Sequence, residues 1–379
     1  MPISLPKPKL ARPSLSARRS GGGKAVVGLD IEPGYVAAVE AQPDGLAVER
    51  AASAPLAPGV VRDGEIADVD ALAGVLRGFF REHGFGRRVR LGVANQRIVV
   101  RTVDLPPLED RKELAAAVSF HAQEHIPMPL EQAVLDFQSM GVVDTPEGPR
   151  TRVVLVAARR DMIERLLAAA RQAGLRPAGI DLSAFAMVRA LQEPAGEAAG
   201  EAEAGATAVE GQATLYVCVG GMTNLALAER SRCVFTRVVA GGTETMAQEL
   251  AERRGLTHEH AHQWLVHVGL VTPVDDVEGD PAIVSEARAV LGEGVRRIGD
   301  EIRNSLDFYR MQDGAIPVGD AVLTGPAAAV EGFADGLGHQ VSLPMRLGLV
   351  AEARPGALAG IDAGRLAVAA GLTVEERAA

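Results

Sequence analysis

The sequence VVGLDIEPGYVAAVE, residues 26–40, decides the fold of this chain. A mostly apolar run leads to Asp30, a turn follows at Pro33 and Gly34, and a second apolar run starts at Tyr35. Two strand-like runs around turn residues of this kind predict a β-hairpin.

A second copy of this pattern, LYVCVGGMTNLALAE, occupies residues 215–229, with its turn at Gly220 and Gly221. Two such hairpins about half a chain apart predict a duplicated architecture, in which both turns face a central cleft. In folds built this way, the two turns bind the phosphates of a nucleotide through backbone N–H groups. Whether this chain binds a nucleotide therefore depends on the residues in its turns.

Length and composition narrow the class of protein. A chain of 379 residues is long enough for two or three domains, at roughly 150 residues each. Hydrophobic residues make up 47% but aromatic residues only 3%, so Ala, Val and Leu fill the core of a globular α/β protein. The net charge of −10 argues against nucleic-acid binding, which needs basic surface for phosphates.

The expected location is intracellular. The only cysteines, Cys218 and Cys233, lie in apolar runs, as expected for buried thiols in a reducing compartment. No apolar run approaches the ~18 residues that cross a bilayer, and no signal-peptide core is present. The sequence therefore predicts a soluble protein.

Two segments lack the residues of a packed core. Residues 1–23 form a basic tail rich in Pro, Ser and Gly, for which we expect disorder. Contact with an anionic membrane is the alternative, at about 1 kcal/mol per basic residue. Residues 193–212, rich in Ala, Gly and Glu, are expected to be a solvated linker between the two halves.

Three local predictions bear on the later argument. A helix over 109–125 is expected to bury Leu114, Val118 and His121, and a long helix is expected over 282–312. After Gly325, a helix is expected from about residue 328, and then a loop through Pro344. A histidine-rich helix carries His258, His260, His262 and His267, and both a metal site and a solvated polar face are consistent with it.

Several longer motifs resemble the PilM family, the actin-like proteins of type IV pilus assembly. In the first half they are VGLDIEPGYVAAVE, PLAPGVVRDGEIAD, VANQRIVVRTVDLPPL and EHIPMPLEQAVLDFQSM. In the second half they are TRVVAGGTETMAQELAERRGL, RRIGDEIRNSLDFYR and AVLTGPAAAVEGFADGL. The resemblance covers about residues 24–372.

This resemblance implies an actin-like ATPase fold: two duplicated, ribonuclease H-like α/β halves flank a cleft, with an inserted 1C subdomain. The implied subdomains are 1A (24–98 and 160–192), 1C (99–159), 2A (213–239 and 319–379) and 2B (240–318).

The resemblance also implies a partner and a location. Family members lie at the cytoplasmic face of the inner membrane and bind the N-terminal tail of the membrane protein PilN in a groove between 1A and 1C. Other pilus assembly components are further partners, and a homodimer remains open. The groove residues implied here are Arg97, Val99, Arg101, Val103, Leu114 and Val118.

The nucleotide motifs depart from the family pattern. In the first turn Glu32 and Pro33 replace Gly-Ser, and Ala37 or Ala38 replaces a lysine; Cys218 replaces an aspartate before the second turn. A like charge beside a phosphate is unfavourable, and proline has no N–H to donate. We therefore expect weak or lost binding of ATP and Mg²⁺, with no catalytic residues. The degenerate site comprises Asp30, Ile31, Gly34, Tyr35, Gly220, Gly221, Met222, Thr223, Asn224, Gly241, Gly242, Gly325, Pro326 and Ala327.

Three functions compete at this point. The first is a scaffold that docks a PilN-like tail and performs no chemistry. The second is an active ATPase or phosphotransferase, which Asp30 and the two turns favour. The third is a membrane-tethered filament protein resembling FtsA. That class anchors through a C-terminal amphipathic helix, which residues 373–379 do not supply.

Overall fold

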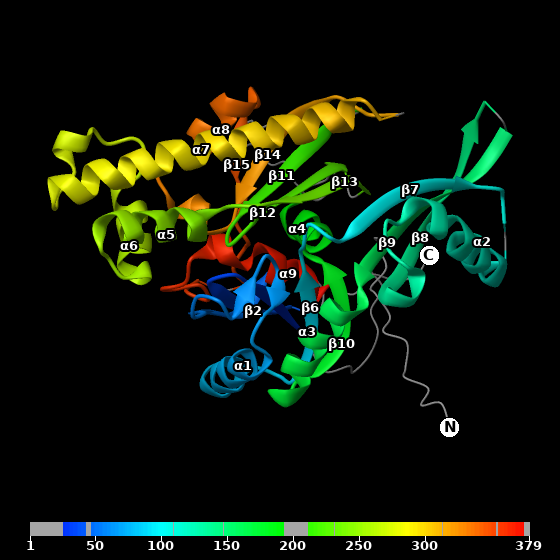
Figure 1. Cartoon of the computed structure of the whole chain (residues 1–379), viewed down its shortest axis with the longest axis horizontal. Coiled ribbons are helices and arrows are strands. Elements are labelled where there is room, and N and C mark those ends of the chain that lie inside the picture. Colours follow the sequence, from blue (N-terminus) through cyan, green and yellow to red (C-terminus); the bar gives the residue numbers. More distant parts are fainter. Residues whose placement is uncertain are drawn as a thin grey trace.

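The computed structural model describes residues 26–42, 47–108, 110–146, 148–192, 211–230, 232–312, 314–353 and 355–374. The predicted basic tail lies outside these residues, and so does the predicted linker up to residue 210. Two halves, each built on a five-stranded sheet, lie one above the other, and a smaller sheet projects from the first half (Figure 1).

The first half contains a mixed sheet of order β10-β6-β1-β2-β3. The hairpin predicted over 26–40 forms its antiparallel core, and β6 and β10 continue the sheet in parallel with β1. The strands are β1 (Val27–Glu32), β2 (Tyr35–Ala41), β3 (Val48–Pro55), β6 (Arg88–Val93) and β10 (Arg176–Leu182).

The second half repeats this topology in a sheet of order β13-β12-β11-β14-β15. Again a hairpin and a third strand are antiparallel, and two further strands continue in parallel. The predicted duplication is therefore confirmed. The strands are β11 (Ala213–Val219), β12 (Thr223–Glu229), β13 (Arg232–Val239), β14 (Val318–Thr324) and β15 (Met345–Leu347).

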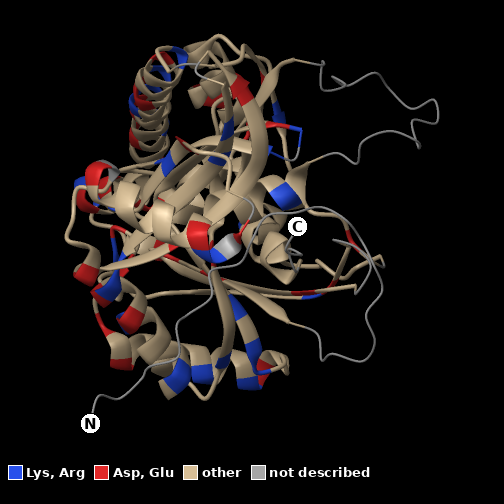
Figure 2. Cartoon of the chain, turned by 90° about the vertical axis from the view of Figure 1, so that its right-hand side faces the viewer, with Lys and Arg blue, Asp and Glu red and all other residues tan. Residues whose placement is uncertain are grey.

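Helices cover the outer faces of both sheets. In the first half these are α1 (Val69–His83) and α3 (Arg160–Gln172). In the second half they are α5 (Thr243–Arg254), α6 (His258–Val268), α7 (Pro281–Arg310) and α8 (Phe333–Val341). Basic and acidic residues are interspersed over most of these elements (Figure 2).

Two helices, α4 (Ser183–Leu191) and α9 (Ala367–Thr373), form the core between the sheets. The backbone of α9 lies so close to β1 and to α4 that glycine is required at the points of contact. A Cβ on Gly28 of β1 would lie 1.8 Å from the carbonyl oxygen of Ala369, and one on Gly371 would lie 1.8 Å from that of Ala186. A buried ion pair between Asp181 and Arg189 joins the end of β10 to α4.

An inserted unit extends the first half. Its sheet has the order β7-β9-β8, from β7 (Val99–Leu105), β9 (Gly148–Arg159) and β8 (Ala133–Thr145), and α2 (Arg111–His125) packs on one face. Leu114 and Val118 are buried as predicted, but the prediction for His121 was wrong: its side chain is 37% exposed and Ala122 is buried. Each four-residue step turns the helix by about 40° beyond a full turn, so the buried face moves on to Ala122.

Two further predictions were wrong in the second half. The helix expected from about residue 328 begins at Phe333. The chain first forms the 3₁₀ turn η3 (Pro326–Ala329), and Gly332, with φ +78°, keeps the backbone out of the right-handed helical region just before α8. The expected loop after Pro344 contains β15, which pairs with β14. The long helix α7 is confirmed, and Asp280 caps its start.

The remaining elements are short: β4 (Val61–Arg62), β5 (Glu65–Ile66), η1 (Leu130–Gln132), η2 (Val274–Asp276) and η4 (Ala363–Leu366). Among the helices of the described residues, none combines the length and the apolar character needed to cross a membrane.

Candidate functional site

The turns of the two hairpins touch each other at the centre of the molecule. A Cβ added to Gly221 would lie 2.3 Å from the carbonyl oxygen of Pro33 and 2.7 Å from its ring carbons Cβ and Cδ. The first turn is tight, because Glu32 pairs with Tyr35 and leaves only Pro33 and Gly34 between the strands. The backbone of the second turn therefore rests directly on Pro33.

Glu244, at the start of α5, closes another side of the first turn. Gly34 has φ +93°, and a Cβ there would lie within 2.1–2.5 Å of the carboxylate atoms of Glu244. His258 holds this carboxylate, with 2.6 Å between Nε2 and Oε2. This hydrogen bond raises the pKa of His258. Sequence reasoning missed Glu244, because no local pattern brings α5 to the first hairpin.

Buried acidic groups lie beneath the turns. Asp30 is 1% exposed, and burial raises its pKa to about 7, against the opposing effect of the N–H of Ile31. Burial and then the charge of Asp30 raise the pKa of Glu32 well above its usual value. A hydrogen bond from the backbone N–H of Met222, in the opposite turn, acts in the other direction on Glu32. The carboxyl group of Glu32 thus faces the second turn.

Arg365 of η4 approaches this region from the C-terminal end of the chain. Its guanidinium carbon lies 5.0 Å from the ring centroid of Tyr35, and its Nε lies 3.3 Å from Oδ2 of Asp362. Its Nη2 also lies 3.4 Å from Nε2 of His262. Burial and the charge of Arg365 lower the pKa of His262. Arg365 was not predicted as a site residue, since it is distant in sequence from both hairpins.

The histidine-rich helix is α6. His258 and His262 lie one helical turn apart but contact different partners, Glu244 and Arg365. His267 lies 2.8 Å from the carbonyl oxygen of Glu278. Among the described residues, no three His, Cys, Asp or Glu side chains group as metal ligands.

The predicted glycine pair before α5 packs against the second turn. A Cβ on Gly242 would lie 2.1 Å from the carbonyl oxygen of Gly220. The hydroxyl of Thr243 donates to the same oxygen at 3.2 Å, and that of Thr223 donates to the carbonyl oxygen of Gly241 at 2.8 Å. Both threonines therefore help to hold Gly241 and Gly242 against the second turn.

The predicted residues Gly325, Pro326 and Ala327 follow β14 and lie beside the end of β11. Gly325 has φ +88°, and a Cβ there would lie 2.6 Å from the carbonyl oxygen of Val219. Pro326 and Ala327 are buried at the start of η3. Ile31 instead packs on the core of the first half. The structure thus gathers the predicted turn residues, with the exceptions of Ile31 and Asn224, around one closely packed contact.

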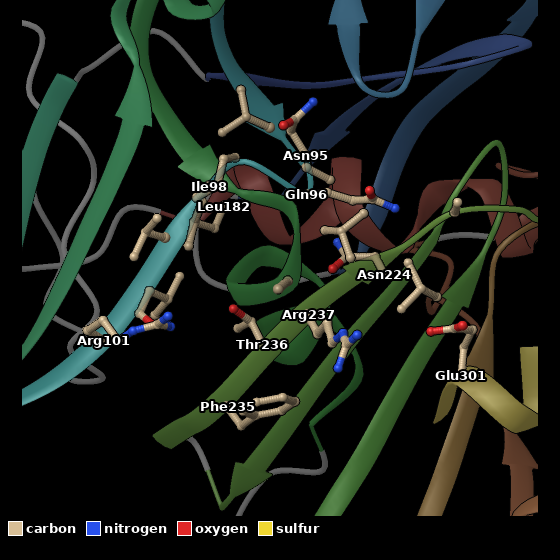
Figure 3. A pocket seen from close by; sticks show the side chains of 18 of the residues that line it. Asn95, Gln96, Ile98, Arg101, Leu182, Asn224, Phe235, Thr236, Arg237 and Glu301 are labelled. Carbon is tan, nitrogen blue, oxygen red and sulfur yellow. The ribbon is translucent and has the colours of Figure 1, made fainter. Parts of the chain in front are cut away.

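Asn224 lies in a separate groove of about 670 Å³ (Figure 3). One wall comes from the segment between β6 and β7 and from the start of β7, including the predicted residues Val99 and Arg101. The other wall comes from β12, β13 and α7, which belong to the second half. Leu182 and Ala184, around the start of α4, also line it.

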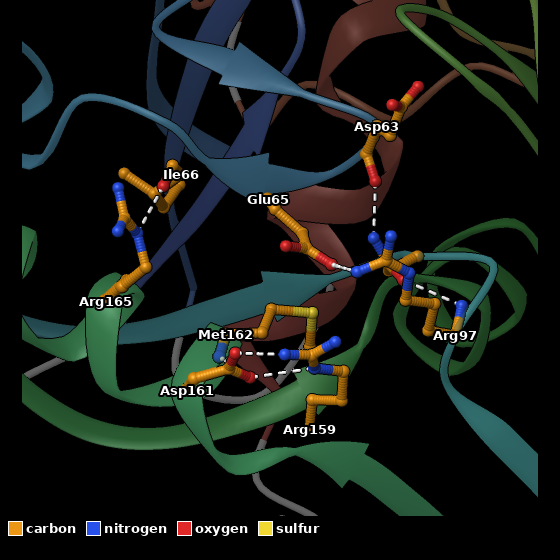
Figure 4. Close-up of polar contacts among 9 residues, drawn as sticks. Asp63, Glu65, Ile66, Arg97, Arg159, Asp161, Met162 and Arg165 are labelled. Carbon is orange, nitrogen blue, oxygen red and sulfur yellow. Dashed lines mark hydrogen bonds and ion pairs between the residues drawn. The ribbon is translucent and has the colours of Figure 1, made fainter. Parts of the chain in front are cut away.

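The other predicted groove residues do not line this groove. Arg97 is exposed and pairs with Glu65, with 3.1 Å between Nη1 and Oε1 (Figure 4). Val103 packs against the core of the inserted unit. Leu114 and Val118 belong to this core, so they support β7 and do not offer surface.

Two arginines form polar contacts where β9 of the inserted unit leads into α3 of the first half. Arg165 of α3 donates to the backbone carbonyl oxygens of Ile66 and Ala67, both at 2.7 Å. Arg159, at the end of β9, pairs with Asp161 through two hydrogen bonds (Figure 4). The Arg165 bonds thus tie α3 to β5 and the residue after it within the first half, and the pair of Arg159 and Asp161 stabilises the step from β9 into α3.

Comparisons with known proteins agree with this architecture. Among solved structures, the chain is similar to one described as a PilM-PilN type IV pilus biogenesis complex, at 25% identity. The match covers 92% of this chain and 97% of that chain, with a TM-score of 0.74. The ethanolamine utilization protein EutJ from Carboxydothermus hydrogenoformans shares the fold at 13% identity, with 97% of this chain and 92% of that chain covered and a TM-score of 0.53.

The expected actin-like ATPase fold is therefore confirmed. A family model described as type IV pilus assembly protein PilM matches residues 28–372, which is most of the sequence. This chain belongs to the PilM family of type IV pilus assembly proteins.

Proposed function

We propose that this protein is a scaffold of the type IV pilus assembly machinery that docks the N-terminal tail of a PilN-like membrane protein. The groove beside β7 carries this proposal, because it is large, is lined by both apolar and polar side chains, and includes the predicted residues Val99 and Arg101. A relative of the same family was solved as a PilM-PilN complex. By this binding the protein would be held at the cytoplasmic face of the inner membrane.

We also propose that the molecule divides into the subdomains 1A and 1C at the bounds expected from the sequence. On these bounds β7, α2, β8 and β9 form 1C, and β1, β2, β3, β6 and β10 belong to 1A. The segment between β6 and β7, where Asn95 donates to the carbonyl oxygen of Asp63, is then the boundary between the two. The groove lies at that boundary.

The experiment is a calorimetric titration of the protein with a synthetic peptide of the N-terminal residues of its PilN-like partner. We expect micromolar or tighter binding. Val99→Glu places a charge in the groove and should abolish binding. Val142→Glu is the matched control, because Val142 is 64% exposed on β8 and does not line the groove. Absence of binding to the unaltered protein, with and without ATP, would refute the scaffold function.

We further propose that the central contact does not hold a magnesium nucleotide. A polyphosphate needs space and N–H donors between the turns, whereas Gly221 rests on Pro33, which has no N–H. The carboxylate of Glu244, which closes the first turn at Gly34, would also face the phosphates with like charge. These residues do not fit the group that the fold family binds.

A fluorescent ATP analogue tests this second proposal. We expect no saturable change of fluorescence up to millimolar nucleotide with Mg²⁺. Saturable binding would contradict the proposal and would reopen the ATPase or phosphotransferase function. Docking of the peptide does not depend on the outcome, so the two proposals fail independently.

A further inference from the structure

The groove has a second wall, which does not belong to 1A or to 1C. An unbroken run of residues from Phe235 to Ala240, in β13 and just after it, lines the groove. Glu301 and Phe308 of α7 lie beside this run (Figure 3). The second half therefore forms as much of the groove as the inserted unit does.

Both walls present the edge of a sheet. β13 is the last strand of the second sheet and β7 the last strand of the small one, so neither has a neighbour on its outer side among the described strands. Successive side chains of a strand point to opposite faces. Consecutive residues of both strands line the groove, so the backbone edges themselves face it. Unpaired N–H and C=O groups at such an edge can pair with an added strand.

Asn224 supplies a second, independent observation. Its side chain is 4% exposed and lines the groove, and its Oδ1 has no hydrogen-bond partner among the described residues. A buried polar atom without a partner costs free energy, so native structures rarely keep one. An N–H donor on a bound segment would satisfy this oxygen.

The charges and apolar side chains of the groove define the segment that fits. Arg101 on β7 and Arg237 on β13 are both exposed cations at the groove. Neither forms an ion pair with a residue that the structure describes, and Glu301 is the one carboxylate in the lining. A neutral or acidic segment is thus favoured over a basic one. Phe235, Val99 and Phe308 offer apolar contacts.

We propose that the docked tail is an extended, apolar segment without central basic residues that pairs with the edge of β13 and donates an N–H to Asn224. The tail thereby links the second half to the inserted unit. This inference rests on the proposed function, and it adds the second half to the binding site.

The first test uses two substitutions on α7. Phe308 is 47% exposed and lines the groove, whereas Met311 is 79% exposed and does not. With the synthetic PilN-like peptide, we expect Phe308→Ser to weaken binding at least tenfold and Met311→Ser to leave it unchanged. Equal affinity of the two variants would overturn the inference.

The second test separates a binding role of Asn224 from a structural one. Asn224→Leu removes a buried polar group without a partner, so we expect the free protein to unfold at higher denaturant concentration. The same change should weaken peptide binding, because the acceptor is gone. Weaker binding together with lower stability would assign Asn224 a structural role and contradict the proposal.

Hydrogen exchange provides the direct readout. Peptide binding should slow the exchange of backbone amides between residues 235 and 240 as well as those in β7. If the peptide binds and only the amides of β7 are protected, the second wall is not used and the inference fails while the scaffold function stands. If the unaltered protein binds no peptide, the scaffold function itself fails.

Discussion

The backbone of Gly221 lies directly on Pro33, so that a Cβ on this glycine would come within 2.3 Å of the Pro33 carbonyl oxygen. These residues occupy the turns of two hairpins that begin the two halves of the molecule. The two halves are therefore joined through direct protein contacts between these turns. If this contact stabilises the fold, a larger side chain at Gly221 should destabilise the protein.

Gly221→Ala should lower the free energy of unfolding by roughly 1–3 kcal/mol, since one of the two turns must move away. Urea denaturation measures the change. Gly74→Ala is the matched control: no heavy atom lies within 4 Å of its Cβ position in α1, and replacing a helical glycine should stabilise by roughly 0.5–1 kcal/mol. A Gly221→Ala protein as stable as the control would show that the turns separate freely.

Asp30 should make stability depend on pH. Its folded pKa of about 7 lies above its usual value of 3.8, so the folded protein keeps a proton that the unfolded chain releases. The stabilisation from this proton is complete below about pH 3.8 and is lost as the pH rises through about 7. Asp30→Asn should flatten this decline, as measured by urea denaturation between pH 4 and 8.

The control for this prediction is Asp276→Asn, which changes an exposed carboxylate on η2. It should leave the slope of stability against pH unchanged. If Asp30→Asn keeps the slope of the unaltered protein, the buried carboxyl group is not its source. Glu32, whose pKa is also raised, would then be replaced by glutamine in the same experiment.

The ion pair between Asp181 and Arg189 should be costly to break from one side. Its side chains are 2% and 8% exposed, and Arg189 also donates to the carbonyl oxygen of Gly371 at 3.2 Å. Arg189→Met leaves a buried carboxylate uncompensated, which costs about 3–5 kcal/mol. Thermal and urea denaturation measure the loss.

The exposed ion pair between Arg310 and Asp307 is the control for the buried pair. Arg310 and Asp307 are 59% and 69% exposed, and Arg310→Met should change stability by less than about 1 kcal/mol. Similar losses in the two variants would mean that burial of the first pair contributes nothing.

Replacing Arg165 should destabilise the protein more than replacing Arg97. Arg165→Ala leaves two backbone carbonyl oxygens without their donor, and we expect a loss of about 1–3 kcal/mol. Arg97→Ala breaks an exposed pair with Glu65 and should cost less than about 1 kcal/mol. The reverse order in urea denaturation would contradict the view that Arg165 ties α3 to β5.

Much of the fold could be predicted, because its signals are local. Hairpin turns, helix caps and apolar periodicity depend on residues a few positions apart. Asp68 caps α1 in this local way, since its side chain accepts the N–H of Ala71, three residues on, at 2.9 Å. The strand β15 was missed, because its three residues carry no strand pattern and form a strand only by pairing with β14.

The candidate site was predicted less completely. The turn residues were named from a family motif, and the structure brings most of them together, while their role in nucleotide binding stays a prediction. Glu244 and Arg365 were missed, and Asn224 lies in the groove and not at the turns. Each of these positions depends on how elements from different parts of the chain pack.

By itself the sequence determined the duplicated halves, the family and the substitutions of Glu32 and Pro33 in the first turn. These are properties of short segments and their order. Only the tertiary structure decided that Pro33 meets Gly221, that Glu244 faces Gly34, and that β13 completes the groove beside β7. The physical reason is that such contacts depend on the relative placement of two separately folded sheets, which no local pattern encodes.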